Sequence, residues 1–162
     1  MLFLLTSPML FAQSKIAHVS TKALLDTLPS RKKAMAEIQE ITRRSETELI
    51  ELDKQLEKSY NDYMAKKSEQ SATANQYEEN RLQKMQQDLQ QREQQLNADI
   101  QKLSAATNDR TFKIVKDAIK TVADKKGLQY VVDRDGTLYA NGTDITAEVI
   151  AELLRMDAIA KQ

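Results

Sequence analysis

Apolar positions recur at alternating steps of three and four residues along two stretches of the chain, a spacing typical of coiled-coil helices. The first stretch runs through Met35, Ile38, Thr42, Ser45, Leu49, Leu52, Leu56, Tyr60 and Tyr63. The second runs through Leu82, Met85, Leu89, a polar position at Arg92, and then Leu96, Ile100, Leu103, Thr107, Ile114, Ala118 and Val122. Neither Gly nor Pro occurs between Ser30 and Lys126, which predicts long helices.

The repeat loses its phase at residues 66–76 (KKSEQSATANQ), which contain no large apolar side chain. We interpret this segment as the tip of a helical hairpin. Its two antiparallel arms would each have about forty residues and be about 60 Å long. A single uninterrupted helix is the alternative.

The start of the chain and the end of the long helical region predict parts of a small α/β body. Residues 15–20 (KIAHVS) alternate between apolar and polar side chains and predict a strand. A short helix follows over residues 21–28 and is ended by Pro29. The long helical region is predicted to stop at Gly127, which follows two lysines and is free to adopt a positive φ.

The last part of the chain predicts a β-hairpin and a closing helix. Residues 128–133 and 137–140 flank Arg134-Asp135-Gly136, so the hairpin would have Asp-Gly at its turn. Thr146 is the predicted N-cap of a helix that runs to about Met156. The predicted fold class is therefore α+β. Residues 15–29 and 127–156 form a small β body, and residues 30–126 form a long hairpin arm inserted into it.

Composition narrows the class of protein. Charged residues make up 30% of the chain and aromatic residues only 5%, which suits long helices with narrow apolar seams. The formal net charge is zero, which argues against a general nucleic-acid binder. Cys is absent, which excludes disulfides, thiolate metal sites and a Cys nucleophile. We expect no metal, cofactor or nucleic acid to be bound.

Residues 1–12 (MLFLLTSPMLFA) form an apolar run that is too short to span a bilayer, which needs about 20 residues. The run ends before the polar residues Gln13, Ser14 and Lys15, as the cleavage end of a secretory signal does. We predict a signal-peptide remnant at residues 1–12 and an exported protein. No Lys or Arg precedes the run, and a buried N-terminal helix is the alternative.

The string DRDGT at residues 133–137 follows an apolar run, as the nucleophilic aspartate motif of haloacid-dehalogenase-type phosphatases does. Too few residues follow Thr137 to build the remaining strands of that fold. Asp133 and Asp135 alone would also hold the required Mg²⁺ poorly. We interpret DRDGT as a hairpin turn and expect no catalytic residue and no enzymatic activity.

Residues 15–38 and 122–153, with a charged helical hairpin between them, resemble the Skp/OmpH family of periplasmic chaperones for outer-membrane proteins of Gram-negative bacteria. The most specific part is KKGLQYVVDRDGTLYANGTDIT, and the resemblance extends from residue 15 to about residue 154. It implies a homotrimer of jellyfish architecture, with a central β-barrel and three hairpin arms around a cavity that holds an unfolded client. It also implies that neither ATP nor a chemical reaction is involved.

This chain departs from the well-known members of that family in its charge. Those members are strongly basic, whereas this chain has 24 basic and 24 acidic residues. The difference argues against capture of acidic clients, or of lipopolysaccharide, by positively charged arms.

Two groups of side chains near the arm tips are candidate contact sites. Tyr and Met suit adaptable surfaces, so we predict client contact through Tyr60, Tyr63, Met64, Tyr77 and Met85. A basic group that could meet lipid headgroups or acidic segments consists of Lys66, Lys67, Arg81 and Lys84. The alternatives are that the first group packs the hairpin seam and that the second is merely solvated. The only histidine, His18, is expected to be structural.

Together these features predict an ATP-independent periplasmic holdase. It would bind unfolded outer-membrane β-barrel proteins, form a homotrimer, and make at most weak contact with a membrane surface. A structural coiled-coil protein of the cell envelope, without chaperone activity, is the alternative.

Overall fold

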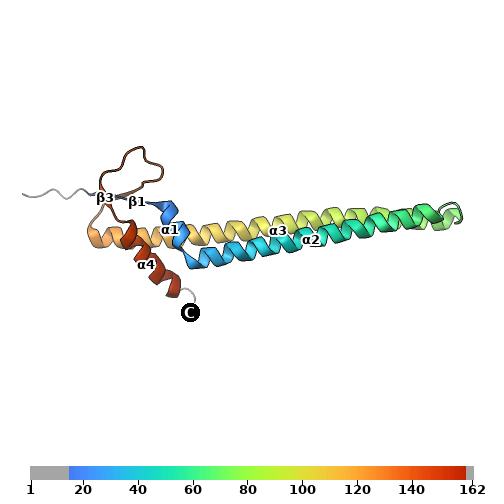
Figure 1. Ribbon diagram of the computed structural model, residues 1–162, viewed down its shortest axis with the longest axis horizontal. Helices are drawn as coiled ribbons and strands as arrows, with labels where there is room; N and C mark the ends of the chain where they lie inside the picture. The colour runs from blue at the N-terminus through green and yellow to red at the C-terminus, as the bar shows by residue number, and fades with distance from the viewer. Residues whose placement is uncertain (1–14, 160–162) are drawn as a thin grey trace, which may run out of the picture. The chain divides into compact units, whose positions relative to one another are not determined.

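The computed structural model describes residues 15–159, so the signal peptide predicted for residues 1–12 lies outside the described residues. The described chain is mostly helical, with one small sheet (Figure 1). Its elements are β1 (Ile16–Val19), α1 (Thr21–Thr27), α2 (Pro29–Lys66), α3 (Ala72–Lys126), β2 (Tyr130–Asp133), β3 (Thr143–Asp144) and α4 (Thr146–Ile159). The chain divides into two compact units. Residues 31–110 form one, and the segments before residue 31 and after residue 110 form the other, which we call the body.

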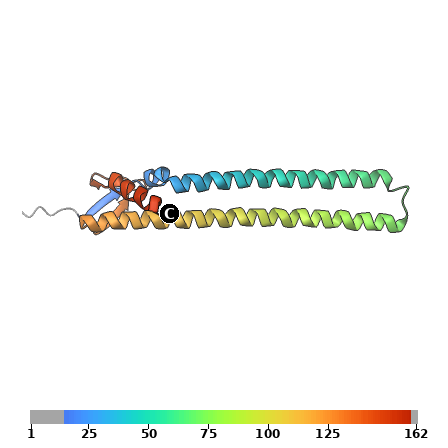
Figure 2. The ribbon, with the colours of Figure 1, turned by 90° about the horizontal axis from the view of Figure 1, so that it is seen from below.

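Residues 31–110 form a helical hairpin in which α2 and α3 lie side by side in both views (Figure 1, Figure 2). Glu48 in the middle of α2 is bonded to Arg92 of α3, and Tyr63 near the end of α2 is bonded to Glu79 near the start of α3. Because later residues of α2 contact earlier residues of α3, the two helices are antiparallel, as predicted. The buried side chains of this seam include those of Ile38, Ser45, Tyr63 and Leu82.

The turn between the two helices is held by hydrogen bonds from short polar side chains. Ser71 caps α3, since its hydroxyl accepts a hydrogen bond from the backbone N–H of Ala74 at 3.2 Å. The side chain of Asn75 donates to the backbone carbonyl of Lys67 at 3.0 Å and so ties the start of α3 to the turn. The alternative of one uninterrupted helix is therefore wrong. The Ser and Asn residues that mark the segment as polar also supply its capping groups.

The body contains a three-stranded parallel sheet with β1 in the centre, in the order β2-β1-β3. Ile16 of β1 pairs with Tyr130 of β2, and Ala17 pairs with Thr143 of β3. The predicted β-hairpin is wrong, because β2 pairs with β1 and residues 137–140 form no strand. The sheet of a single chain is open, with β2 and β3 at its two edges.

The Asp-Gly turn exists, but it does not connect two paired strands. The backbone N–H of Thr137 donates to the carbonyl of Arg134 at 3.0 Å, as in a β-turn. Among the described residues only Gly127 has a positive φ, so Gly136 does not adopt the conformation that a tight type I′ hairpin needs. The two aspartates of the turn instead accept hydrogen bonds from backbone N–H groups at the start of α1.

The hydrophobic core of the body is built from every helix of that unit and from β1. It comprises Ala17, Val19, Leu24, Leu28, Val115, Ala118, Val122, Ile145, Val149 and Leu153. Three of these core residues, at positions 115, 118 and 122, belong to α3, in a segment that the sequence analysis assigned to the arm. Three short strands and two short helices have little apolar surface to bury among themselves, and the last turns of α3 supply the missing layer.

Two helix boundaries were predicted in the body, the end of α3 and the start of α4, and only the first is confirmed. Gly127, with φ of 65°, ends α3 as expected. Its N–H bonds to Asp124 at 3.2 Å and that of Leu128 to Ala123 at 3.0 Å, which is a Schellman motif. The prediction for Thr146 is wrong, since it is the first residue of α4 and not its cap. Its hydroxyl accepts a hydrogen bond from the backbone N–H of Ser20 at 3.0 Å, which links α4 to the end of β1.

Candidate binding site on the helical hairpin

The five side chains predicted to contact a client differ in their exposure to solvent. Tyr60, Met64 and Tyr77 are exposed, Tyr60 by 52% and Met64 by 49%. Met85 is partly buried. Tyr63 is only 5% exposed and belongs to the seam between the helices. Three of the five residues therefore expose substantial apolar surface to solvent.

Tyr63 is held by a polar network that joins α2 to α3. Its hydroxyl donates to a carboxylate oxygen of Glu79 at 2.6 Å, and the ammonium of Lys67 donates to the same oxygen at 3.2 Å. That ammonium also lies 5.2 Å from the centre of the Tyr63 ring, within reach of a cation–π interaction. The hydrogen bond to Glu79 raises the pKa of Tyr63, and the hydrogen bonds from Tyr63 and Lys67 lower the pKa of Glu79. The network ties α2 to α3 close to the turn.

An open groove with a volume of about 550 Å³ runs beside this network. We call it the hairpin groove; its lining consists of Asp53, Leu56, Glu57, Tyr60, Tyr63, Met64, Lys67, Glu79, Leu82, Gln83 and Gln86. On α2, positions 53, 57, 60 and 64 follow steps of four, three and four, so they lie along one face of the helix. The groove thus combines half-exposed apolar side chains with carboxylates.

The predicted basic group near the turn is partly neutralised by neighbouring acids. Lys67 pairs with Glu79 at 3.2 Å, and Arg81 pairs with Glu78 at 2.8 Å. Lys66 and Lys84 form no ion pair with any acidic side chain among residues 15–159. Two of the four predicted cations are therefore available for an anionic partner.

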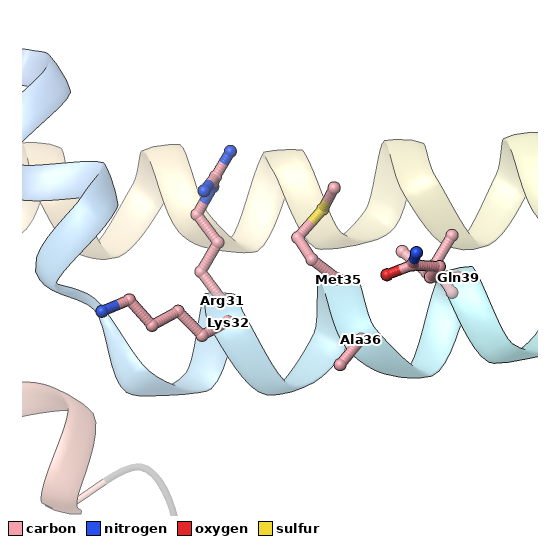
Figure 3. Close-up of a pocket in the computed structure, with 6 residues that line it drawn as sticks. Arg31, Lys32, Met35, Ala36 and Gln39 are labelled. Atoms are coloured by element: carbon pink, nitrogen blue, oxygen red, sulfur yellow. The ribbon is translucent and has the colours of Figure 1, made fainter.

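A second hollow lies at the start of the hairpin, where the sequence analysis identified no site. It has a volume of about 520 Å³, and its lining includes Arg31, Lys32, Met35, Ala36, Ile38 and Gln39 of α2. Arg31 and Met35 project to the same side of the helix (Figure 3). The RKKAM string in which these residues occur is the only sequence signal for this hollow, and it is also typical of an ordinary solvated helix face.

The carboxylates of the DRDGT string cap α1. Asp135 accepts hydrogen bonds from the Ser20 hydroxyl at 2.8 and 3.0 Å and from the backbone N–H of Lys22 at 2.8 Å. Asp133 accepts from the backbone N–H of Thr21 at 3.1 Å, and this bond lowers the pKa of Asp133. Both acids thus satisfy backbone groups that the first turn of a helix leaves without partners.

His18 lies in the middle of β1 and is buried. Its Nε2 is 3.6 Å from a carboxylate oxygen of Asp144, which also pairs with Arg134 at 2.9 Å. Asp144 in turn accepts hydrogen bonds from the hydroxyl and backbone N–H of Thr146, which lower its pKa. This cluster connects the central strand to β3 and to the start of α4.

No group of three or more potential metal ligands (His, Cys, Asp or Glu) comes together within residues 15–159. None of the helices in this part of the chain is sufficiently long and apolar to span a membrane.

Comparisons with known proteins match nearly the whole described chain. A family model described as "Outer membrane protein (OmpH-like)" matches residues 15–153. A search of curated proteins finds no significant match. The fold is similar to that of a crystal structure from Caulobacter crescentus CB15, a candidate outer membrane chaperone (OmpH-like). The TM-score is 0.78 at 21% sequence identity, and the alignment covers 90% of this chain and 86% of that one.

Proposed function

This chain belongs to the OmpH-like family, and on that premise we propose that it is an ATP-independent holdase chaperone. Its clients are unfolded outer-membrane β-barrel proteins in the periplasm of a Gram-negative bacterium. Such chains expose apolar strands that aggregate unless they are covered. The chaperone holds them by many weak contacts and releases them without an energy source.

The observation that carries the proposal is the exposed apolar surface of the helical hairpin. Tyr63 is buried in the seam, whereas Tyr60, Met64 and Tyr77 of the same hairpin are exposed. Tyr60 and Met64 also line the same groove, which Ile50 does not. Flexible Met and amphipathic Tyr side chains are suited to partners of varied sequence.

The same proposal includes a homotrimer in which three bodies join their sheets into a barrel. It is supported by the open sheet and by exposed apolar side chains on β2 and in the segment that follows it, which include Tyr130, Val132, Leu138 and Tyr139. Unpaired strand edges and exposed apolar side chains invite association with another chain. Closing three small sheets against one another would remove both.

We further propose that the protein acts by binding and not by catalysis. In support, Asp133 and Asp135 use their oxygens to cap α1. Weak contact with a membrane surface through Lys66 and Lys84 belongs to the same proposal, because a cation near anionic lipid contributes about 1 kcal/mol.

The test is light scattering from a urea-unfolded outer-membrane β-barrel protein that is diluted into buffer without nucleotide. We expect the chain from Gln13 onward to suppress aggregation and to saturate at one trimer per client. The double substitution Tyr60→Ala/Met64→Ala should weaken the suppression more than Ile50→Ala, an exposed apolar control of the same helix outside the hairpin groove. If a sample shown to be helical suppresses nothing, the structural envelope coiled coil is the better account.

A further inference from the structure

The hairpin groove carries an uncompensated pair of acidic side chains. Asp53 and Glu57 are four residues apart on α2, which places both carboxylates on one helix face. Within the described chain, no basic side chain lies within ion-pair distance of either one. Lys54 lies next to Asp53 and three residues before Glu57, and Lys58 lies next to Glu57, but no ion pair joins either lysine to the two carboxylates.

This pair differs from the other acids of the hairpin, several of which have basic partners. Glu40 pairs with Arg43 and Arg44, Glu48 pairs with Arg92, and Glu79 pairs with Lys67; Glu78 also pairs with its neighbour Arg81. Two like charges at this spacing destabilise a helix slightly, so the pair does not contribute to folding. In a chain with zero net charge, it gives the groove a local negative charge.

The apolar part of the groove follows the acid pair along the same helix face. Tyr60 and Met64 come three and seven residues after Glu57, and about half of each side chain is exposed. At the far end the charge of Lys67 is already paired with Glu79. The groove therefore offers an apolar surface bordered on one side by two available carboxylates.

We infer that the hairpin groove binds segments of an unfolded client in which Lys or Arg stands beside an aromatic or aliphatic side chain. The apolar side chain packs on Tyr60 and Met64, while the cation pairs with Asp53 and Glu57. The inference rests on the proposed function, because it assigns part of the client binding to this groove. Charge complementarity is the argument for this occupant, since an anionic segment would be repelled from the same surface.

The probe is a set of three short unstructured peptides with identical apolar residues, including one Trp. Their remaining positions carry Lys, Gln or Glu. Because the chain contains no Trp, the peptide Trp can be excited selectively, and its emission reports burial against the groove. The Lys peptide should bind about two- to thirtyfold more tightly than the Gln peptide at low salt, the range for two exposed ion pairs. This preference should largely disappear at about 1 M salt.

Substitutions locate the effect in the groove. Asp53→Asn/Glu57→Gln should abolish the preference for the Lys peptide and leave binding of the Gln peptide unchanged. Glu51→Gln/Asp62→Asn is the matched control, because it removes the same charge from exposed positions of α2 that do not line the groove. This control should keep the preference. Tyr60→Ala/Met64→Ala should weaken binding of all three peptides.

Three results would overturn the inference. The first is equal binding of the three peptides, and the second is loss of the preference in the control as well as in the groove variant. The third is a change in oligomeric state of Asp53→Asn/Glu57→Gln on sedimentation, which would assign the groove to a second copy of this chain. Client aggregation is measured on the same samples. If the wild-type chain suppresses client aggregation but binds the three peptides equally, only the inference about the groove is refuted. If it prefers the Lys peptide but does not suppress aggregation, only the holdase function is refuted.

Discussion

Two adjacent leucines of α4 provide a direct test of the body core. Leu153 is 0% exposed and lies in the hydrophobic core, whereas its neighbour Leu154 is 38% exposed. Replacing either one by Ala makes the same chemical change in the same helix, so the effect on helix propensity is common to both. The difference in stability between the two variants therefore measures packing alone.

The expected magnitude follows from burial. Removing a fully buried Leu side chain costs about 2–5 kcal/mol, because apolar contacts are lost and a cavity remains. With an m-value of about 1–3 kcal/mol per M in urea, Leu153→Ala should lower the unfolding midpoint by about 0.7–5 M. Leu154→Ala removes a side chain that water already reaches, and its cost should be about 1 kcal/mol or less.

The assay is urea unfolding followed by circular dichroism and by tyrosine fluorescence. All samples are kept at one protein concentration, because association would shift the apparent stability. Hydrogen exchange in the same variants shows which of the two units loses stability. Amides of the body should lose more protection than those of residues 31–110. An equal fall in midpoint for the two variants would refute the packing of α4 described above.

Three further predictions concern charges and a backbone conformation. Asp133 and Asp144 have folded-state pKa values lowered from the ordinary 3.8 by hydrogen bonds. The two carboxylates therefore stabilise the folded state above pH 3.8, and this stabilisation is lost as the pH falls from 3.8 through their lowered pKa values. Asp144→Asn should lose less stability in acid than the wild type does, as measured by acid titration. Arg92 makes two hydrogen bonds to Glu48 on the facing helix, and a double-mutant cycle should give a coupling of about 0.2–1 kcal/mol that decreases in high salt. Gly127→Ala should cost about 1–2 kcal/mol in thermal unfolding, because an added Cβ meets nothing within 4 Å and only the positive φ opposes it.

The helical hairpin was predictable because its signals are local. The three–four spacing of apolar residues and the lack of Gly and Pro between residues 30 and 126 predict long helices. Ser and Asn in residues 66–76 supply the groups that cap and close the turn. Strand β1, helix α1 and the stop at Gly127 were likewise predictable from neighbouring residues.

The candidate site was only partly predictable. Tyr60 and Tyr63 occupy equivalent positions in the periodic pattern, but one is half exposed and the other is buried in the seam. The two side chains leave α2 in different directions, and this difference decides their exposure only when α3 packs beside α2. The acid pair of the groove is visible in the string DKQLE, yet only the positions of Tyr60 and Met64 show that it borders an apolar surface.

By itself, the sequence determined the long helices, their turn, the first strand and the presence of a small sheet, because these depend on spacing and on conformational preferences of neighbouring residues. Tertiary structure decided which strand pairs with which, how far α3 extends into the body core, and what the aspartates of DRDGT bind. An Asp-Gly turn specifies a change of direction but not a partner strand. The partner is chosen by contacts between residues more than one hundred positions apart, such as Ser20 with Asp135 and Ile16 with Tyr130, which no local pattern records.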